Sequence, residues 1–128
     1  SIELPVLCSA ISIILFKIKG YKNSIKYLSQ FNSDDQILSS LAKGSIGDCF
    51  VQLDQLEDAL DYYEKAIDIN INDYTTAMYL LKAAHVSMEL NKNKKSYNYF
   101  SRIKSDFPNT VSAENIDVFI SKAKALLK

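Results

Sequence analysis

The chain has few of the residues that punctuate loops, bind metals or form disulfide bridges. Its 128 residues include three glycines, two prolines, two cysteines, one histidine and no tryptophan. So few glycines and prolines argue against an all-β fold, which needs frequent turns. Cys8 and Cys49 do not form a CxxC pair, and one histidine cannot complete a metal site with them. We therefore expect no metal, no cofactor and no disulfide framework.

The charge balance also argues against several classes of partner. Fifteen basic residues offset fifteen acidic ones, so the chain lacks the net positive charge typical of proteins that bind nucleic acids. Arg102 is the only arginine, which leaves one side chain for bidentate recognition of phosphate. The longest apolar run, Leu4 to Phe16, has 13 residues. A membrane-spanning helix needs about 20, so we interpret this run as a buried helix.

Apolar residues recur at helical spacing through most of the chain. In LEDALDYYEKAI, which begins at residue 56, Leu56, Ala59 and Tyr63 share one face, and the charged residues take the other. The same test predicts helices near residues 3–18, 21–31, 36–53, 56–69, 74–90, 94–106 and 112–127. The predicted N-caps are Ser33, Asp34, Asp73 and Ser112, and Pro108 is predicted to end the sixth helix. The predicted fold class is all-α.

These helices form pairs that share one spacing. A small residue is followed four positions later by a bulky residue, and three positions further on by an apolar one. The three sets are Ser24, Leu28 and Phe31; Ala59, Tyr63 and Ala66; and Ser96, Phe100 and Ile103. A small residue lets two helices approach closely, and the bulky one fills the space beside it. The spacing therefore predicts a repeated pair of packed helices.

This pattern resembles the tetratricopeptide repeat, a helix-turn-helix unit of about 34 residues. Residues 40–73 match it best, through Ile46, Gly47, Phe50, Leu56, Ala59, Tyr63 and Ala66. Residues 5–38 and 77–110 are weaker matches, and Cys8, Lys43 and Leu80 stand where the family has an early tryptophan. The resemblance implies one domain over residues 1–128: an α-solenoid of about three repeats with a capping helix at 112–127. It also implies a protein-binding scaffold rather than an enzyme.

Part of the sequence is similar to one bacterial subgroup of that family. The stretches that carry this similarity are GSIGDCFVQLDQLEDALDYYEKAI, YTTAMYLLKAA and YFSRIKSDFPNT. Members of the subgroup carry their soluble repeats behind a single N-terminal membrane helix. The similarity implies the extracytoplasmic face of a membrane if such an anchor precedes this chain, and the cytoplasm otherwise. It leaves open a self-associating structural domain of a membrane-anchored assembly protein.

The stretch KGSIGDC, residues 43–49, raises the alternative of a phosphate-binding loop. Such a loop needs a nest of backbone N–H groups and a lysine after its glycines. Here Asp48 follows Gly47, and a carboxylate at that place would repel phosphate. We predict instead that Gly44 and Gly47 lie inside a helix, with Gly47 packed closely against Ala59.

In the resembled family the concave face is lined by one stripe of the first helix of each repeat. Carried over to this chain, the partner-binding residues are Ile13, Phe16, Leu41, Asp48, Val51, Met78, Leu81, His85 and Met88. Most of them are apolar. We expect this face to bind an apolar or amphipathic segment of a partner protein, of a neighbouring copy or of the chain's own N-terminal part. The alternative is that the stripe is core, buried between successive helices.

The sequence contains features of two other functional classes. His85 is the only histidine, and no recognised motif places a nucleophile beside it, so we expect no catalysis. The predicted sixth helix carries a basic and aromatic set, which is how single strands of nucleic acid are held. The set is Lys94, Lys95, Tyr97, Tyr99, Arg102 and Lys104. We rank nucleic acid below protein as a partner, because Tyr99 is expected to pack between helices.

Overall fold

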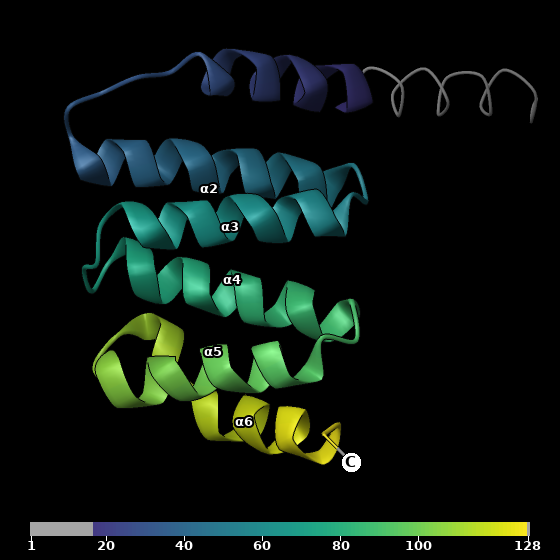
Figure 1. The fold of residues 1–128 in the computed structure, drawn as a ribbon, viewed down its shortest axis with the longest axis vertical. Coiled ribbons are helices and arrows are strands. Elements are labelled where there is room, and N and C mark those ends of the chain that lie inside the picture. The colour runs from purple at the N-terminus through teal and green to yellow at the C-terminus, as the bar shows by residue number, and fades with distance from the viewer. Residues whose placement is uncertain (1–16, 128) are drawn as a thin grey trace, which may run out of the picture.

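The computed structural model describes residues 17–127, and this part of the chain is entirely helical in its regular structure. A helix over residues 17–29 precedes the others. These are α2 (Gln36–Gln52), α3 (Leu56–Ile69), α4 (Thr75–Glu89), α5 (Asn93–Asp106), the short 3-10 helix η1 (Val111–Ala113) and α6 (Ile116–Ala125). From α2 to α6, successive α-helices run antiparallel and lie beside one another in chain order (Figure 1). The prediction of an all-α fold is confirmed for the described residues.

The helix over residues 17–29 corrects one predicted boundary. The sequence predicts a break near residues 19–20, but the helix continues without interruption through Gly20. A glycine inside a helix costs about 1 kcal/mol relative to alanine and does not by itself end the helix. The turn expected inside residues 5–38 is therefore not found. The earlier half of that predicted repeat, with Ile13 and Phe16, lies outside the described residues.

The α2–α3 and α4–α5 connections use the same turn. Each contains one residue with a positive φ, 57° at Asp54 and 60° at Asn91. The next residue donates its backbone N–H to the carbonyl five positions back, at 2.9 Å in the first turn and 2.8 Å in the second. This is the Schellman arrangement that closes many helices. The two helices of each pair are therefore joined by the same type of turn.

The starts of α2 and α4 are capped one residue away from the predicted positions. Asp35, rather than Ser33 or Asp34, accepts two backbone N–H groups of α2, at 2.9 and 3.2 Å. Asn72, rather than Asp73, accepts two backbone N–H groups at the start of α4, at 2.9 and 2.7 Å. The path of the preceding loop decides which polar side chain can reach the free amides, and the sequence does not specify that path.

The last helix is shorter than predicted. Residues 111–113 form η1, and Asn115 has a φ of 60°, so α6 begins at Ile116 and Ser112 does not cap it. The end of α5 agrees with the prediction, because the helix stops at Asp106, two residues before Pro108.

The core is built from the small and bulky residues of the last two predicted sets. All six are buried: Ala59, Tyr63, Ala66, Ser96, Phe100 and Ile103. Ser96 donates its hydroxyl to the carbonyl of Ala84 at 2.9 Å, which ties α5 closely to α4. In the first set the outcome differs, because Ser24 and Phe31 are exposed and Leu28 is half-buried. The repeated spacing therefore predicts buried packing correctly for α3 and α5 only.

The glycine pair lies in the interior of α2, as predicted. Both Gly44 and Gly47 are buried. A Cβ on Gly47 would lie 3.2 Å from the carbonyl oxygen of Ala59, so the predicted close approach of these two residues is confirmed. A regular helix uses its interior backbone N–H groups for its own hydrogen bonds. The pair therefore does not form a phosphate-binding nest.

Candidate functional site

The seven described residues of the predicted stripe lie on α2 and α4, two helices in contact with each other. None of the seven is fully buried. The five apolar members are half-buried and pack against the core from outside; they are Leu41, Val51, Met78, Leu81 and Met88. Asp48 is also half-buried, and His85 is exposed. The stripe is thus neither a fully open surface nor part of the interior.

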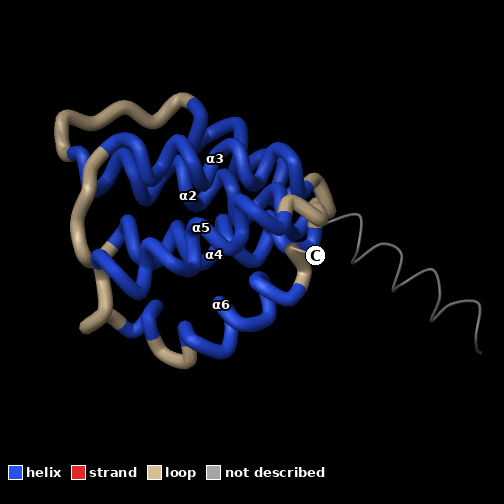
Figure 2. The backbone as a smooth tube through the Cα atoms, turned by 60° about the horizontal axis from the view of Figure 1, so that its bottom comes forward, coloured by secondary structure: helices blue, strands red, loops and turns tan. Residues whose placement is uncertain are grey.

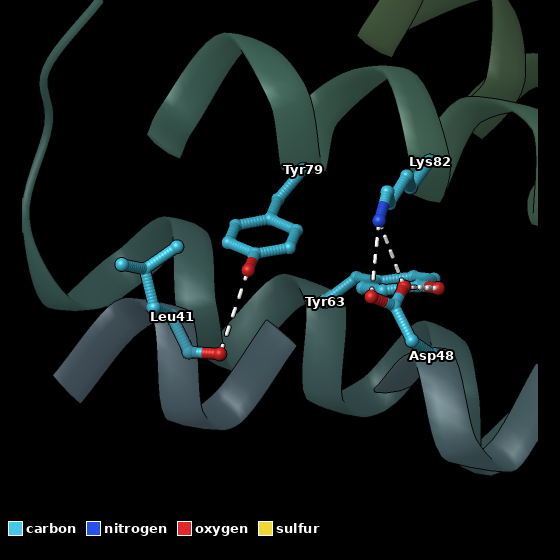
Figure 3. Close-up of polar contacts among 5 residues, drawn as sticks. All are labelled: Leu41, Asp48, Tyr63, Tyr79 and Lys82. Atoms are coloured by element: carbon cyan, nitrogen blue, oxygen red, sulfur yellow. Dashed lines mark hydrogen bonds and ion pairs between the residues drawn. The ribbon is translucent and has the colours of Figure 1, made fainter. Parts of the chain in front are cut away.

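Asp48 is the polar centre of this face. Lys82 on α4 places its Nζ 2.9 Å from Oδ1 and 3.0 Å from Oδ2 of the Asp48 carboxylate. Tyr63 on α3 donates its hydroxyl to Oδ1 at 2.6 Å. Figure 3 shows the lysine and the tyrosine converging on the carboxylate from different helices. One side chain of α2 therefore links three helices.

The surroundings of Asp48 raise the pKa values of three nearby side chains. Burial, together with the hydrogen bond to Asp48, raises the pKa of Tyr63 above its ordinary value. Burial, helped by the same carboxylate, raises the pKa of Tyr79 to about 12. Burial and Asp48 also raise the pKa of the Cys49 thiol, which makes it a weak nucleophile. At neutral pH the two phenols and the thiol are uncharged.

The ring of Tyr79 covers α2 beside part of the predicted stripe. Its ring extends from α4 to α2, where its hydroxyl lies 3.5 Å from the carbonyl oxygen of Leu41 (Figure 3). The ring occupies the space that a side chain on Gly44 would need, because a Cβ there would lie 1.9 Å from the ring. The ring of Tyr63 stacks on it at a centroid distance of 5.9 Å. The two tyrosines and glycine form one packed unit beneath the face.

Three contacts around this face were not predicted from the sequence. Tyr63 and Lys82 bind Asp48, and the ring of Tyr79 covers Gly44. A usable signal was present only for Tyr79. A glycine inside a helix leaves room for a large neighbouring side chain, so Gly44 was a partial signal for such a partner. The Asp48 contacts join residues 15 and 34 positions apart, and no local pattern marks such pairs.

Five of the seven stripe residues border three separate hollows rather than one continuous groove. Asp48, Val51 and His85 line an open groove of about 260 Å³. Met78 lines a hollow of about 490 Å³ beside the α3–α4 connection. Met88 and His85 border a third, of about 450 Å³, that also contacts α6. The first groove therefore contains the largest group of predicted residues.

His85 has a packing role on one side of its ring. Its ring meets Phe100 on α5 and Phe119 on α6 edge to face, at centroid distances of 5.1 and 4.8 Å. Partial burial and the positive charge of Lys122 lower the pKa of His85, and Glu89 opposes this effect. These effects favour the neutral imidazole at pH 7, and His85 also lines two of the hollows described above.

Four of the six residues of the predicted basic and aromatic set on α5 contact acidic residues. The ion pairs are Lys95 with Glu64 at 3.0 Å, Arg102 with Asp106 at 3.5 Å and Lys104 with Asp117 at 2.7 Å. Tyr99 also donates its hydroxyl to Glu64. These pairs place negative charge beside the cations, which weakens the attraction of this helix for a phosphate backbone.

The hydrogen bond of Tyr63 should contribute more to stability than the ion pair of Lys82. We expect Tyr63→Phe to lower the free energy of unfolding by about 1.5 kcal/mol, because a hydrogen bond to a charged group is lost from a buried ring. Lys82→Met keeps the apolar stem and should cost less than about 1 kcal/mol, since both charges of the pair are 38–44% exposed. Urea denaturation of both variants tests this order. The reverse order would show that the ion pair holds the helices together.

Neither metal-ligand geometry, nor helix hydropathy, nor comparison with known proteins adds a functional assignment to this site. Among residues 17–127, no group of three or more histidine, cysteine, aspartate or glutamate side chains is arranged to hold a metal ion. Within the same residues, no helix has the length and hydropathy that crossing a membrane requires. No family model, curated protein or solved structure matches the chain.

Proposed function

We propose that the chain is a protein-interaction scaffold that binds an apolar or amphipathic segment of a partner on the face formed by α2 and α4. The observation that carries this proposal is the exposure of the stripe. Its five apolar residues stay partly open to solvent around the Asp48–Lys82 pair, although each also touches the core. Apolar side chains gathered on a surface and bordered by polar groups mark interaction sites.

We further propose that the helix pairs form a short α-solenoid of the tetratricopeptide type. The support comes from the two Schellman turns, whose left-handed residues Asp54 and Asn91 are 37 positions apart, and from the chain-order stacking of the helices (Figure 1). In this scheme α2–α3 and α4–α5 are the repeats at 40–73 and 77–110, and α6 is the capping helix. Solenoids of this kind offer extended surfaces for binding.

The chemistry of the face favours a helical or extended segment with one apolar side. Met78 and Met88 have flexible, polarizable side chains that adapt to different apolar partners. The half-exposed Asp48 and Lys82 carry opposite charges, so each can pair with a polar group at the border of a bound segment. Binding of an amphipathic helix in an apolar groove combines these two kinds of contact.

The test compares the wild-type chain with Leu81→Asp as baits in an affinity capture, with bound proteins identified by mass spectrometry. We expect a specific partner that the wild type retains and Leu81→Asp loses, because a charge in the middle of the stripe opposes apolar contact. Val118→Asp is the matched control: Val118 is 64% exposed on α6, away from the stripe, and should retain the partner.

Circular dichroism and thermal melting establish that Leu81→Asp is still folded. If the variant unfolds, Met88→Asp on the same stripe replaces it in the comparison. Identical proteins on all baits would contradict binding at this face. Sedimentation equilibrium covers the remaining case: a wild-type dimer that Leu81→Asp dissociates would show that the face joins two copies of the chain.

A further inference from the structure

A second surface lies along one edge of the helix stack. The connections at residues 30–35, 70–74 and 107–115 all lie on the same side of the molecule, where Figure 2 shows them as loops gathered along one edge. We call these three connections the loop edge. The two Schellman turns lie on the opposite side (Figure 1). The loop edge therefore brings together segments that are far apart in the sequence.

The loop edge is apolar and solvent-exposed at the same time. Its exposed apolar side chains are Phe31 (46%), Ile71 (69%), Tyr74 (66%) and Val111 (81%). Tyr74 and Val111 border the hollow of about 490 Å³, together with Met78 of α4. The exposure of these side chains to water adds nothing to the stability of the fold, and the grouping of Tyr74 and Val111 around a hollow indicates a contact surface.

The charge of the loop edge has one sign. Its three connections contain four acidic residues, Asp34, Asp35, Asp73 and Glu114, and no lysine or arginine. Asp35 uses one carboxylate oxygen to cap α2. The other three are exposed and take part in none of the salt bridges found among residues 17–127. This charge also suits the nearby starts of α2, α4 and α6, because a helix N-terminus favours carboxylates. That preference does not account for the exposed apolar side chains beside it.

We propose that the loop edge is a second docking surface, and that its occupant is a partner's polypeptide segment with apolar residues flanked by lysine or arginine. An apolar side chain of that segment enters the hollow beside Met78, between Tyr74 and Val111. Basic neighbours then lie near Asp73, which lines the hollow, and near Glu114. An acidic segment would be repelled at the same place. Met78 belongs to both surfaces, but the loop edge lies beyond the central part of the α2–α4 face, and the proposal does not depend on the function proposed above.

The experiment uses random 12-residue peptides displayed on phage and selected on the whole chain. We expect the selected peptides to combine apolar residues with lysine or arginine, and to lose affinity as salt is raised to about 0.5 M, since salt screens exposed charges. Val111→Asp should weaken them at least about tenfold and Asp73→Lys at least about fivefold, the range of a contact at the centre of an interface. Both positions are exposed, so neither change should unfold the chain.

The controls separate this surface from the others. Leu127→Asp and Asp58→Lys introduce the same two residue types at exposed positions away from the loop edge, and should change affinity less than about twofold. Leu81→Asp should also leave these peptides bound, even where it abolishes binding at the α2–α4 face. Amide shifts in NMR spectra should move at residues 70–74 and 107–115 when a selected peptide binds.

Several results would overturn the proposal. It would be contradicted by selected peptides without basic residues, or by the absence of any selected peptide. It would also be contradicted by binding that survives Val111→Asp, or by amide shifts confined to α2 and the central part of α4. A second copy is the competing occupant, because residues 17–29 contain four lysines and no acidic residue. A wild-type dimer in sedimentation equilibrium that Val111→Asp dissociates would show that a copy of the chain, rather than a partner protein, occupies the edge.

Discussion

Replacement of Phe100 by alanine is expected to lower the free energy of unfolding by about 3–5 kcal/mol, the usual cost of removing a fully buried ring. Phe100 has no exposed surface. Its ring on α5 stacks on Phe119 of α6 at 5.4 Å and meets His85 of α4 at 5.1 Å. Three helices therefore share the cavity that the substitution would leave, and none of them can fill it without moving away from the others. Urea denaturation followed by circular dichroism measures the loss.

The control for this prediction is Tyr27→Ala. Tyr27 is an aromatic residue of similar size that is 71% exposed, so its removal should change stability by less than about 0.5 kcal/mol. Partial detachment of α6 in Phe100→Ala would appear as faster amide exchange in α6 than in α3. A loss below about 1 kcal/mol would mean that Phe100 does not hold α4, α5 and α6 together.

Gly44→Ala is expected to destabilise the chain by about 2 kcal/mol, although alanine is the better helix former. In a helix the change would normally add about 1 kcal/mol of stability. Here the new Cβ would lie 1.9 Å from the ring of Tyr79, which is itself 2% exposed and has no room to move. Forcing extra volume into a packed core costs about 1–3 kcal/mol and occasionally more. With so short an approach we expect the steric cost to exceed the gain, and thermal and urea denaturation will measure the balance.

Two comparisons isolate the steric cause. Gly20→Ala makes the same chemical change inside the helix over residues 17–29, where no atom lies within 4 Å of the new Cβ. It should be neutral or should stabilise the chain by up to about 1 kcal/mol. In a Tyr79→Leu background Gly44→Ala should cost much less, because the outer part of the ring is gone and the two sites are coupled. Equal costs in both backgrounds would contradict the proposed contact.

Local patterns predicted most of the helices, because helix formation depends mainly on residues that are close together in the sequence. The helix predicted at 56–69 is α3, Leu56–Ile69, and the one at 36–53 differs from α2 by one residue at its end. The errors occur where two local signals compete. Gly20 favours a break, but its neighbours favour a helix, and the helix continues. At the helix starts, several polar residues can serve as caps, and the loop geometry selected Asp35 and Asn72.

The candidate site was predicted only in part. The stripe contained Asp48, Val51 and His85, which the structure places together on one groove. It could not include Lys82 or Tyr79, because the resembled family's stripe does not use those positions. It also treated the stripe as one surface, whereas Met78 and Met88 border separate hollows. That these residues bind a partner stays a prediction.

The sequence by itself determined the all-helical fold of the described residues, most of the helix positions and the small and bulky residues that form the core of α3 and α5. Periodicity and side-chain volume act between neighbours in the chain, so these features can be read from the order of residues. Only the tertiary structure decided how Asp48, Tyr63 and Lys82 meet, which ring covers Gly44, and that three distant connections form one acidic and apolar edge. Those features depend on which helices lie side by side, because helix packing brings together residues that no sequence spacing relates.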